Sequence, residues 1–277
     1  MTENAVLPRS IKTLEQRLKL TTGSTQRWTQ RRRVMAAVIL SQMLPPAAIK
    51  GGTGMKLRLG ESATRFSQDL DVARQGSLRN FVDQLAENLR RGWHGFTGTL
   101  VASRNKPKPP NVPADYIMTP YEVKMQYLGK SWTTITLEIG HDELGDTSDV
   151  HQIMSTEVKE LFENVGLPAP RPVPVIATHH QIAQKIHGVS ASGSERAHDL
   201  VDLQLLVASE TLDLPLIRNT CERLFNFRKS HTWPPTVIEN ESWGSLYKEA
   251  ADGILVLQTA DEAVMWTNEF IFRIVNS

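Results

Sequence analysis

The chain has 277 residues, of which 40 % are hydrophobic and 22 % charged, and its formal net charge is +1. That length and composition indicate an ordinary globular protein with one large domain or two moderate ones, and no apolar run approaches the roughly 20 residues of a membrane span, so we expect a cytoplasmic protein without membrane contact. The single cysteine, Cys221, excludes an internal disulfide, and the near-zero net charge excludes a globally basic surface, so any RNA contact would need local patches.

Two helices are predicted at the start of the chain. Apolar residues recur at helical spacing over residues 9–20 and 25–43, with Ser10 and Ser24 as N-caps. The second helix carries a basic run, Arg31–Arg33, ahead of its apolar end. Such a run is typical of a solvated helix face, and it is also the kind of cluster that contacts an RNA backbone.

The most informative stretch is residues 49–73, where a glycine turn precedes two carboxylates. A strand starting at Asp69 would place Asp69 and Asp71 on one side, about 6.6 Å apart along the chain. With no cation between them the two carboxylates would repel, and Mg²⁺ takes carboxylate and phosphate oxygens as ligands. The glycines at 51 and 52 would let phosphates approach the backbone, and the Thr53 hydroxyl could add a donor.

The pattern therefore predicts a nucleoside-triphosphate site. Each half has an alternative, because Asp-x-Asp and Gly-Gly are both common in surface turns and loops. The segment is not a P-loop, since no Gly-Lys-Ser/Thr follows the glycines at the required spacing.

The following segment predicts a helix and an antiparallel extension of a sheet. Residues 77–92 form an amphipathic pattern that we expect to pack on the back of the sheet, and strand-like runs cover residues 96–102, 117–127 and 133–139. The segment Arg104–Pro110, rich in lysine and proline, is expected to be an exposed loop that could touch RNA.

Alternation in the last predicted strand isolates one acidic residue. Ile135, Leu137 and Ile139 fall on one face, so burying them leaves Glu138 on the polar face. By itself this position is equally typical of a plain solvent-facing glutamate.

A proline-rich segment, Gly166–Pro174, separates this half from a mostly helical one. We place a bridging helix at residues 149–165 and expect two domains: residues 1–148 as a core lobe and residues 149–277 as a mainly helical lobe. In the helical half, Thr178 is expected to cap a helix over residues 179–189, and a second helix covers residues 195–209.

Two pairs of motifs carry a resemblance to a known family. Gly51-Gly52-Thr53, followed by Arg65-Phe-Ser-Gln-Asp69-Leu-Asp71, resembles the active-site signature of the AbiEii/MenT nucleotidyltransferase toxins, members of the polymerase-β-like superfamily. Ile182-Ala-Gln-Lys185-Ile and His198-Asp199-Leu-Val-Asp202-Leu are similar to two later motifs of the family, with His198 in place of an arginine. The resemblance covers about residues 45–210.

The resemblance implies a mixed α/β (α+β) protein with two lobes, an N-terminal nucleotidyltransferase sheet with flanking helices and a mostly helical C-terminal lobe that completes the site. It implies Mg²⁺ as cofactor, with Mn²⁺ as an alternative, and a third metal-binding carboxylate from a neighbouring strand, for which Glu138 is the candidate. The implied catalytic residues are Asp69, Asp71, Lys185 and Asp199; the nucleotide-binding residues are Gly51, Gly52, Thr53, Arg65, Ser67, Lys185 and Asp202; the metal ligands are Asp69, Asp71 and Glu138.

By the same resemblance, the protein would transfer nucleotides from an NTP to the 3′ end of a tRNA, which blocks aminoacylation and translation, and would be paired with a cognate antitoxin. Two alternatives stay open. One is a nucleotidyltransferase that modifies a small molecule or a protein, and the other is a non-catalytic nucleotide- or RNA-binding module.

Overall fold

The computed structural model describes residues 6–67, 69–103 and 118–277. The chain forms two compact units, one of residues 1–61 and 67–175, the other of residues 62–66 and 176–277. The short segment Ser62–Phe66 thus belongs to the second unit although both of its neighbours along the chain belong to the first. The expected boundary after residue 148 stays a prediction about folding domains, and the predicted loop Arg104–Pro110 lies outside the described residues.

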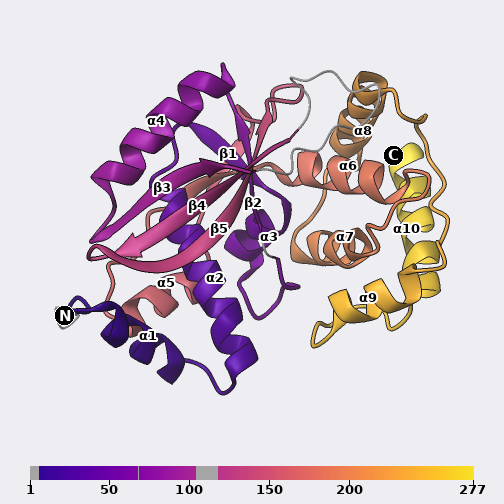
Figure 1. Cartoon of the computed structure of the whole chain (residues 1–277). Helices are drawn as coiled ribbons and strands as arrows, with labels where there is room; N and C mark the ends of the chain where they lie inside the picture. The colour runs from indigo at the N-terminus through magenta and orange to yellow at the C-terminus, as the bar shows by residue number, and fades with distance from the viewer. Residues whose placement is uncertain (1–5, 68, 104–117) are drawn as a thin grey trace. The chain divides into compact units, whose positions relative to one another are not determined.

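The first unit contains a seven-stranded mixed sheet with the strand order β3-β4-β5-β2-β1-β7-β6 (Figure 1). Strands β3, β4 and β5 form the predicted antiparallel extension, while β5 runs parallel to β2, and β1 is antiparallel to β2 and parallel to β7. The mixed α/β class predicted from the sequence is therefore confirmed. The strands are β1 (Ala47–Lys50), β2 (Asp69–Arg74), β3 (Phe96–Ala102), β4 (Thr119–Tyr127), β5 (Lys130–His141), β6 (Val150–Ile153) and β7 (Val173–Ile176).

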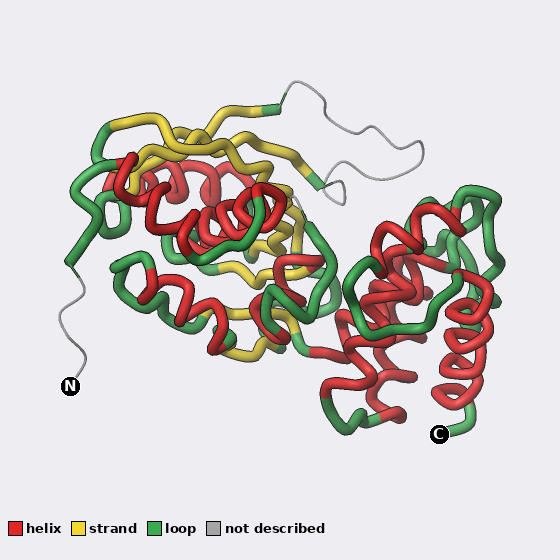
Figure 2. The backbone as a smooth tube through the Cα atoms, turned by 90° about the horizontal axis from the view of Figure 1, so that it is seen from below, coloured by secondary structure: helices red, strands yellow, loops and turns green. Residues whose placement is uncertain are grey.

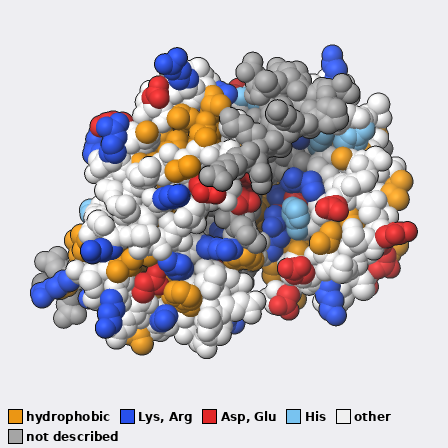
Figure 3. Space-filling view, viewed as in Figure 1, with side chains coloured by type: hydrophobic (Ala, Val, Ile, Leu, Met, Phe, Trp, Pro, Cys, Tyr) orange, Lys and Arg blue, Asp and Glu red, His pale blue; other side chains and the backbone are white. Residues whose placement is uncertain are grey.

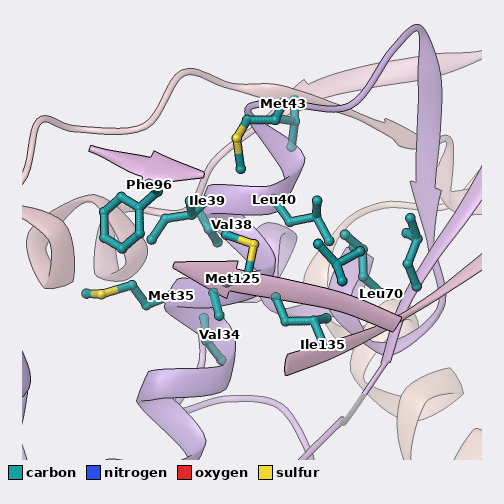
Figure 4. Close-up of a cluster of buried hydrophobic side chains, with 14 of the residues drawn as sticks. Val34, Met35, Val38, Ile39, Leu40, Met43, Leu70, Phe96, Met125 and Ile135 are labelled. Atoms are coloured by element: carbon teal, nitrogen blue, oxygen red, sulfur yellow. The ribbon is translucent and has the colours of Figure 1, made fainter. Parts of the chain in front are cut away.

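One face of the sheet is apolar and packs against helices. Leu70 and Val72 of β2 are buried together with Ile135, Leu137 and Ile139 of β5, as the alternation predicts. The helices α1, α2, α4 and α5 all contribute to the same buried cluster, in which the second half of α2 meets the strands (Figure 4). In Figure 2 the strands of this unit are yellow and its helices red, and helices lie against the strands.

The helices begin where the sequence provides caps. The hydroxyls of Ser10, Ser24 and Ser77 each accept a hydrogen bond from a backbone N–H in the first turn of the helix that follows. The amphipathic helix α4 packs on the sheet through Phe81 and Leu85, which confirms that prediction. The helices of the first unit are α1 (Ile11–Leu20), α2 (Thr25–Ser41), α3 (Gly51–Leu59), α4 (Leu78–Arg91) and α5 (Thr156–Asn164).

In this unit one sequence-based expectation is wrong, and one strand was not anticipated. Residues 149–165 are not one bridging helix, because β6 occupies Val150–Ile153 and α5 starts only at Thr156, after the N-cap Ser155. The end of the proline-rich segment joins the sheet as β7, where Val175 pairs with Ile49 of β1. Extended proline-rich backbone already has strand-like dihedral angles, so a four-residue strand can form in it.

The second unit is helical, as expected. Its core includes Ile182, Ala183 and Ile186, residues of the predicted apolar stripe, and each is fully buried. Thr178, however, is not the cap of α6: the helix starts at this residue, Ala177 is the N-cap, and the Thr178 hydroxyl bonds the Glu210 carboxylate instead. The helices are α6 (Thr178–Val189), α7 (His198–Ser209), α8 (Leu214–Arg228), α9 (Trp243–Ala251) and α10 (Ala260–Val275). None of the described helices is both long and apolar enough to cross a membrane.

Candidate functional site

The glycine turn and the acid pair predicted from the sequence are packed directly against each other. Gly51 has φ +64°, and a Cβ added there would lie 1.8 Å from Oδ2 of Asp71. Any side chain at position 51 would therefore be strained and would also collide with the carboxylate. The glycine is required because the start of α3 lies against the carboxylate end of Asp71.

The first turn of α3 offers backbone donors beside these acids. The N-cap residue, Lys50, makes no side-chain cap, so the first N–H groups of α3 keep their capacity to bind an anion. The Thr53 hydroxyl donates to the backbone carbonyl oxygen of Asp69 at 2.9 Å, which ties the helix to β2. Its predicted contact with phosphate would need this hydrogen bond to be exchanged.

Three carboxylates occupy adjacent positions on the face of the sheet opposite the apolar core. Asp69 and Asp71 project from the same side of β2, and Asp71 is in register with Glu138 of β5. The residues that flank them on β2, Leu70 and Val72, are buried on the opposite face. The structure thus brings together the three residues that the resemblance implies as metal ligands, all within the first unit.

The electrostatic effect of this carboxylate set is seen at Glu138. Burial and, after it, the negative charges of Asp71 and Asp69 together raise the pKa of Glu138 to about 7. A hydrogen bond shared with Asp71 adds to the same effect. Positive charge brought to this set would favour the ionised form of Glu138 at neutral pH.

These residues fit a divalent cation. Three carboxylates on neighbouring strands supply only hard oxygen donors, the kind that Mg²⁺ and Mn²⁺ bind. Placing carboxylates close together costs free energy, and the raised pKa of Glu138 reflects that cost. A bound cation would offset it.

Sequence reasoning did not place three basic residues of this unit beside these acids, but the structure places them there. Lys50, at the end of β1, is in register with Asp71 and only 9 % exposed. Arg33 and Lys56 line a small pocket between α2 and α3, which also contains Thr53, Ser67 and Asp69. The available signal for Lys50 was a lysine ending a short apolar strand immediately before two glycines.

The basic run of α2 is used mostly inside the first unit. Arg31 pairs with Glu61 at 3.3 Å, and Arg32 pairs with Glu15 at 2.7 Å. Figure 3 shows Lys and Arg side chains spread over the viewed face of this unit with Asp and Glu between them, not gathered in one stripe. RNA binding by the run stays a prediction.

In the second unit, the predicted lysine and both aspartates of the later motifs meet in one buried cluster. Lys185 donates from Nζ to Oδ1 of Asp199 at 3.1 Å and to Oδ2 of Asp202 at 2.5 Å. Both aspartates are fully buried, and Lys185 is 5 % exposed. The three residues come from α6 and α7, which pack side by side.

Two arginines complete this cluster. Arg65 donates to the carboxylate of Asp202 through Nε at 3.1 Å and Nη2 at 3.0 Å, which fastens the segment Ser62–Phe66 to α7. Arg196 donates from Nε to Oδ2 of Asp199 at 2.6 Å. A Cβ on Gly188 would come within 2.6 Å of the Arg196 Nε, so the glycine makes room for this pair.

Burial alone would raise the pKa values of both aspartates, but the adjacent cations outweigh it. Lys185 and Arg196 hold the pKa of Asp199 below its ordinary range, and Lys185 and Arg65 do the same for Asp202. Burial and the two arginines lower the pKa of His198 to about 4, against the opposing charge of Asp199, so this imidazole is neutral at pH 7. Arg196, two residues upstream, contacts Asp199 where the family's motif has an arginine at position 198.

Solved structures with a similar arrangement of helices and strands are known, and at the identities concerned they show likeness of fold alone. MenT4, a nucleotidyltransferase toxin of Mycobacterium tuberculosis, matches with a TM-score of 0.56 at 15 % identity, over 96 % of this chain and 98 % of that one. JHP933 from Helicobacter pylori matches with a TM-score of 0.47 at 19 % identity, over 91 % and 93 % of the two chains.

A sequence model of the nucleotidyl transferase AbiEii toxin family, described as a type IV toxin–antitoxin system, matches residues 33–270. The chain therefore belongs to this family, as the motifs predicted, and is a nucleotidyl-transfer toxin. No curated protein sequence matches it.

Proposed function

We propose that the protein transfers a nucleotide from an NTP to the 3′ end of a tRNA, using Mg²⁺ held by Asp69, Asp71 and Glu138. The observation that carries the proposal is the register of these three carboxylates on one polar face, beside the uncapped start of α3. Transfer to the tRNA end would block aminoacylation and hence translation, and a cognate antitoxin would counter it.

The residues of the first unit would bind and orient the donor. Gly51 and Gly52 let the triphosphate approach the backbone N–H groups of α3, while Thr53 and Ser67 lie beside Asp69 in the pocket. Bound Mg²⁺ would supply charge neutralisation and a lowered pKa for the acceptor hydroxyl, which attacks the α-phosphorus in line with the departing pyrophosphate.

The residues of the second unit would supply positive charge. Lys185 carries an ammonium held by two buried carboxylates, and Arg65 carries a guanidinium held by one of them. Asp199 and Asp202 then act by fixing these cations, because their own oxygens are buried and already accept hydrogen bonds. We propose that Lys185 neutralises charge as pyrophosphate leaves.

A labelling screen tests this function. Purified protein is incubated with Mg²⁺, each α-³²P-labelled NTP and, separately, total tRNA, its own polypeptide alone, or small hydroxyl compounds such as aminoglycosides. We expect label on tRNA from at least one NTP, removed by 3′-exonuclease, and a loss of at least ~10³-fold in Asp71→Ala.

The other outcomes of the screen are equally informative. Label on the polypeptide or on a small molecule would identify a different acceptor and overturn the tRNA proposal. No label and no pyrophosphate from any combination would leave a binding module. Labelling that survives Asp71→Ala would refute the assignment of the site.

A further inference from the structure

A nearly buried lysine lies in the middle of the carboxylate face. Lys50 is the last residue of β1, and its register partner on β2 is Asp71, whose own partner on β5 is Glu138. Residues that are directly opposite in adjacent strands project to the same face, so the three side chains form one row across three strands. Only 9 % of the Lys50 surface is exposed.

The sheet leaves space for the ammonium of Lys50 on one side of Asp71, and α3 lies on the other side. The row next to Lys50, Asp71 and Glu138 consists of small residues: Ala48 on β1, Ala73 on β2 and Gly140 on β5. A Cβ on Gly140 would lie 3.2 Å from the Lys50 Nζ. The side chain therefore crosses β2 above Ala73, and its charge lies over β5.

Among the described residues, no other side chain neutralises this ammonium at contact distance. Within the described part of the chain, Lys50 makes no hydrogen bond and no ion pair within 4.0 Å. A buried charge without a partner is costly, so such an arrangement is maintained by charges further away.

Those charges are the carboxylates on either side. The positive charge of Lys50 opposes the rise in the pKa of Glu138, and it opposes the same rise at Asp146, a fully buried residue of the loop after β5. Asp146 is itself fixed, since its Oδ1 accepts from the backbone N–H of Glu143 at 2.9 Å. Lys50 thus lies between a fixed carboxylate and the edge of the proposed metal site.

We propose that Lys50 is a positioning residue of this site: its ammonium, held over Gly140, is the built-in counter-charge that keeps Glu138 beside Asp71 in place for the divalent cation. The inference rests on the proposed function for its catalytic consequence, although not for its effect on metal binding. It assigns Lys50 no contact with the nucleotide.

The role gives two effects of opposite sign. Lys50 and a divalent cation are positive charges attracted by the same carboxylates, so each weakens the binding of the other. Removing the lysine charge should tighten Mn²⁺ binding by about 10-fold, because the lost repulsion between two cations outweighs the looser placement of one ligand. The looser placement of Glu138 should instead slow transfer by about 10-fold or more. A merely structural lysine would not make metal binding tighter.

Calorimetric titration of Mn²⁺ into wild type, Lys50→Met and Lys124→Met tests the first effect. Lys124 is an exposed lysine of β4, and its removal changes the net charge equally. The Mn²⁺ affinity of Lys124→Met should therefore stay within twofold of the wild-type value. Unchanged or weaker Mn²⁺ binding by Lys50→Met would overturn the proposal. If Lys50→Met does not fold, Lys50→Gln takes its place.

A kinetic double-mutant cycle tests the second effect. If Lys50 acts through Glu138, Lys50→Met should lower kcat with the KM for NTP within twofold, and adding it to Glu138→Gln should cost less than twofold more. Additive losses would refute this coupling. If wild type transfers no nucleotide at all, the proposed function has failed, and the Mn²⁺ titration still decides whether Lys50 is the counter-charge.

Discussion

The two units gather carboxylates in opposite ways. In the first unit, burial and the negative charges of Asp71 and Asp69 raise the pKa of Glu138 to about 7. In the second, Asp199 and Asp202 are more deeply buried and yet have lowered pKa values, because Lys185, Arg65 and Arg196 surround them. The first set is arranged to receive a cation, and the second already holds its own.

This difference distinguishes two roles for the aspartates of the motifs, which the sequence alone does not tell apart. An aspartate whose oxygens all face fixed cations contributes through those cations, whereas one that faces other carboxylates can bind a metal ion. We therefore expect changes in the second set to lower mainly stability, with a loss of activity that acts through Lys185, and changes in the first set to lower mainly activity.

The largest stability effect is expected for Asp202→Asn. It leaves Lys185 and Arg65 without their shared carboxylate in a buried environment, which should lower the free energy of unfolding by about 3–5 kcal/mol. Chemical unfolding followed by circular dichroism measures it. Asp83→Asn is the control, because Asp83 also pairs with an arginine, at 4.0 Å, but is 72 % exposed, so its effect should be at most about 0.5 kcal/mol.

Gly51→Ala should come next, with an effect on both stability and activity. The left-handed backbone costs about 1–2 kcal/mol for a residue with a Cβ, and the collision with the Asp71 carboxylate adds to that. Gly76→Ala isolates the first contribution, since Gly76 has φ +72° with no atom within 4 Å of the added Cβ. Equal losses of stability and equal transfer rates in the two variants would contradict the proposed packing of α3 on Asp71.

A smaller loss is expected for Arg196→Gln. The Arg196 side chain is 52 % exposed, and Asp199 keeps its bond to Lys185, so unfolding should become easier by only about 1 kcal/mol. A loss as large as that of Asp202→Asn in the same unfolding experiment would mean that Arg196 is central to the cluster.

The smallest expected effect is the dependence of stability on pH, and its sign differs between the two units. The folded pKa of Glu138, about 7, lies above its unfolded value of about 4.3, so its contribution to stability is complete below the unfolded value and is lost as pH rises through 7. Asp199 and Asp202 have lowered pKa values, so their contribution is present above about pH 3.9 and is lost as pH falls below it.

Thermal melts of wild type and Glu138→Gln in EDTA between pH 5 and 8 isolate the first trend. The wild type should lose stability relative to the variant as pH rises, and Mg²⁺ should shrink the difference. Parallel curves would show that Glu138 does not titrate in this range.

Much of the first unit could be predicted because its signals are local. Alternation places Glu138 opposite Ile135, Leu137 and Ile139, and the glycines before Asp69 and Asp71 indicate close backbone approach, both of which the structure shows. Caps such as Ser24 mark helix starts for the same reason. The paired strand β7 was missed, because pairing of Val175 with Ile49 joins residues more than 120 positions apart.

The charge partners could not be predicted, since they too depend on tertiary contacts. Nothing in the sequence near Arg65 indicates that it bonds Asp202, and the isolated position of Lys50 depends on which residues β1, β2 and β5 place around it. The motifs identify the residues of a site, while the contacts decide whether an acid binds a metal ion or a lysine.

The most direct test of this distinction is Mn²⁺ titration of the wild type, Asp71→Asn and Asp202→Asn, measured by calorimetry. We predict one divalent site in the wild type, its loss in Asp71→Asn and its retention in Asp202→Asn. Binding that survives Asp71→Asn, or that is lost in a folded Asp202→Asn, would contradict this prediction.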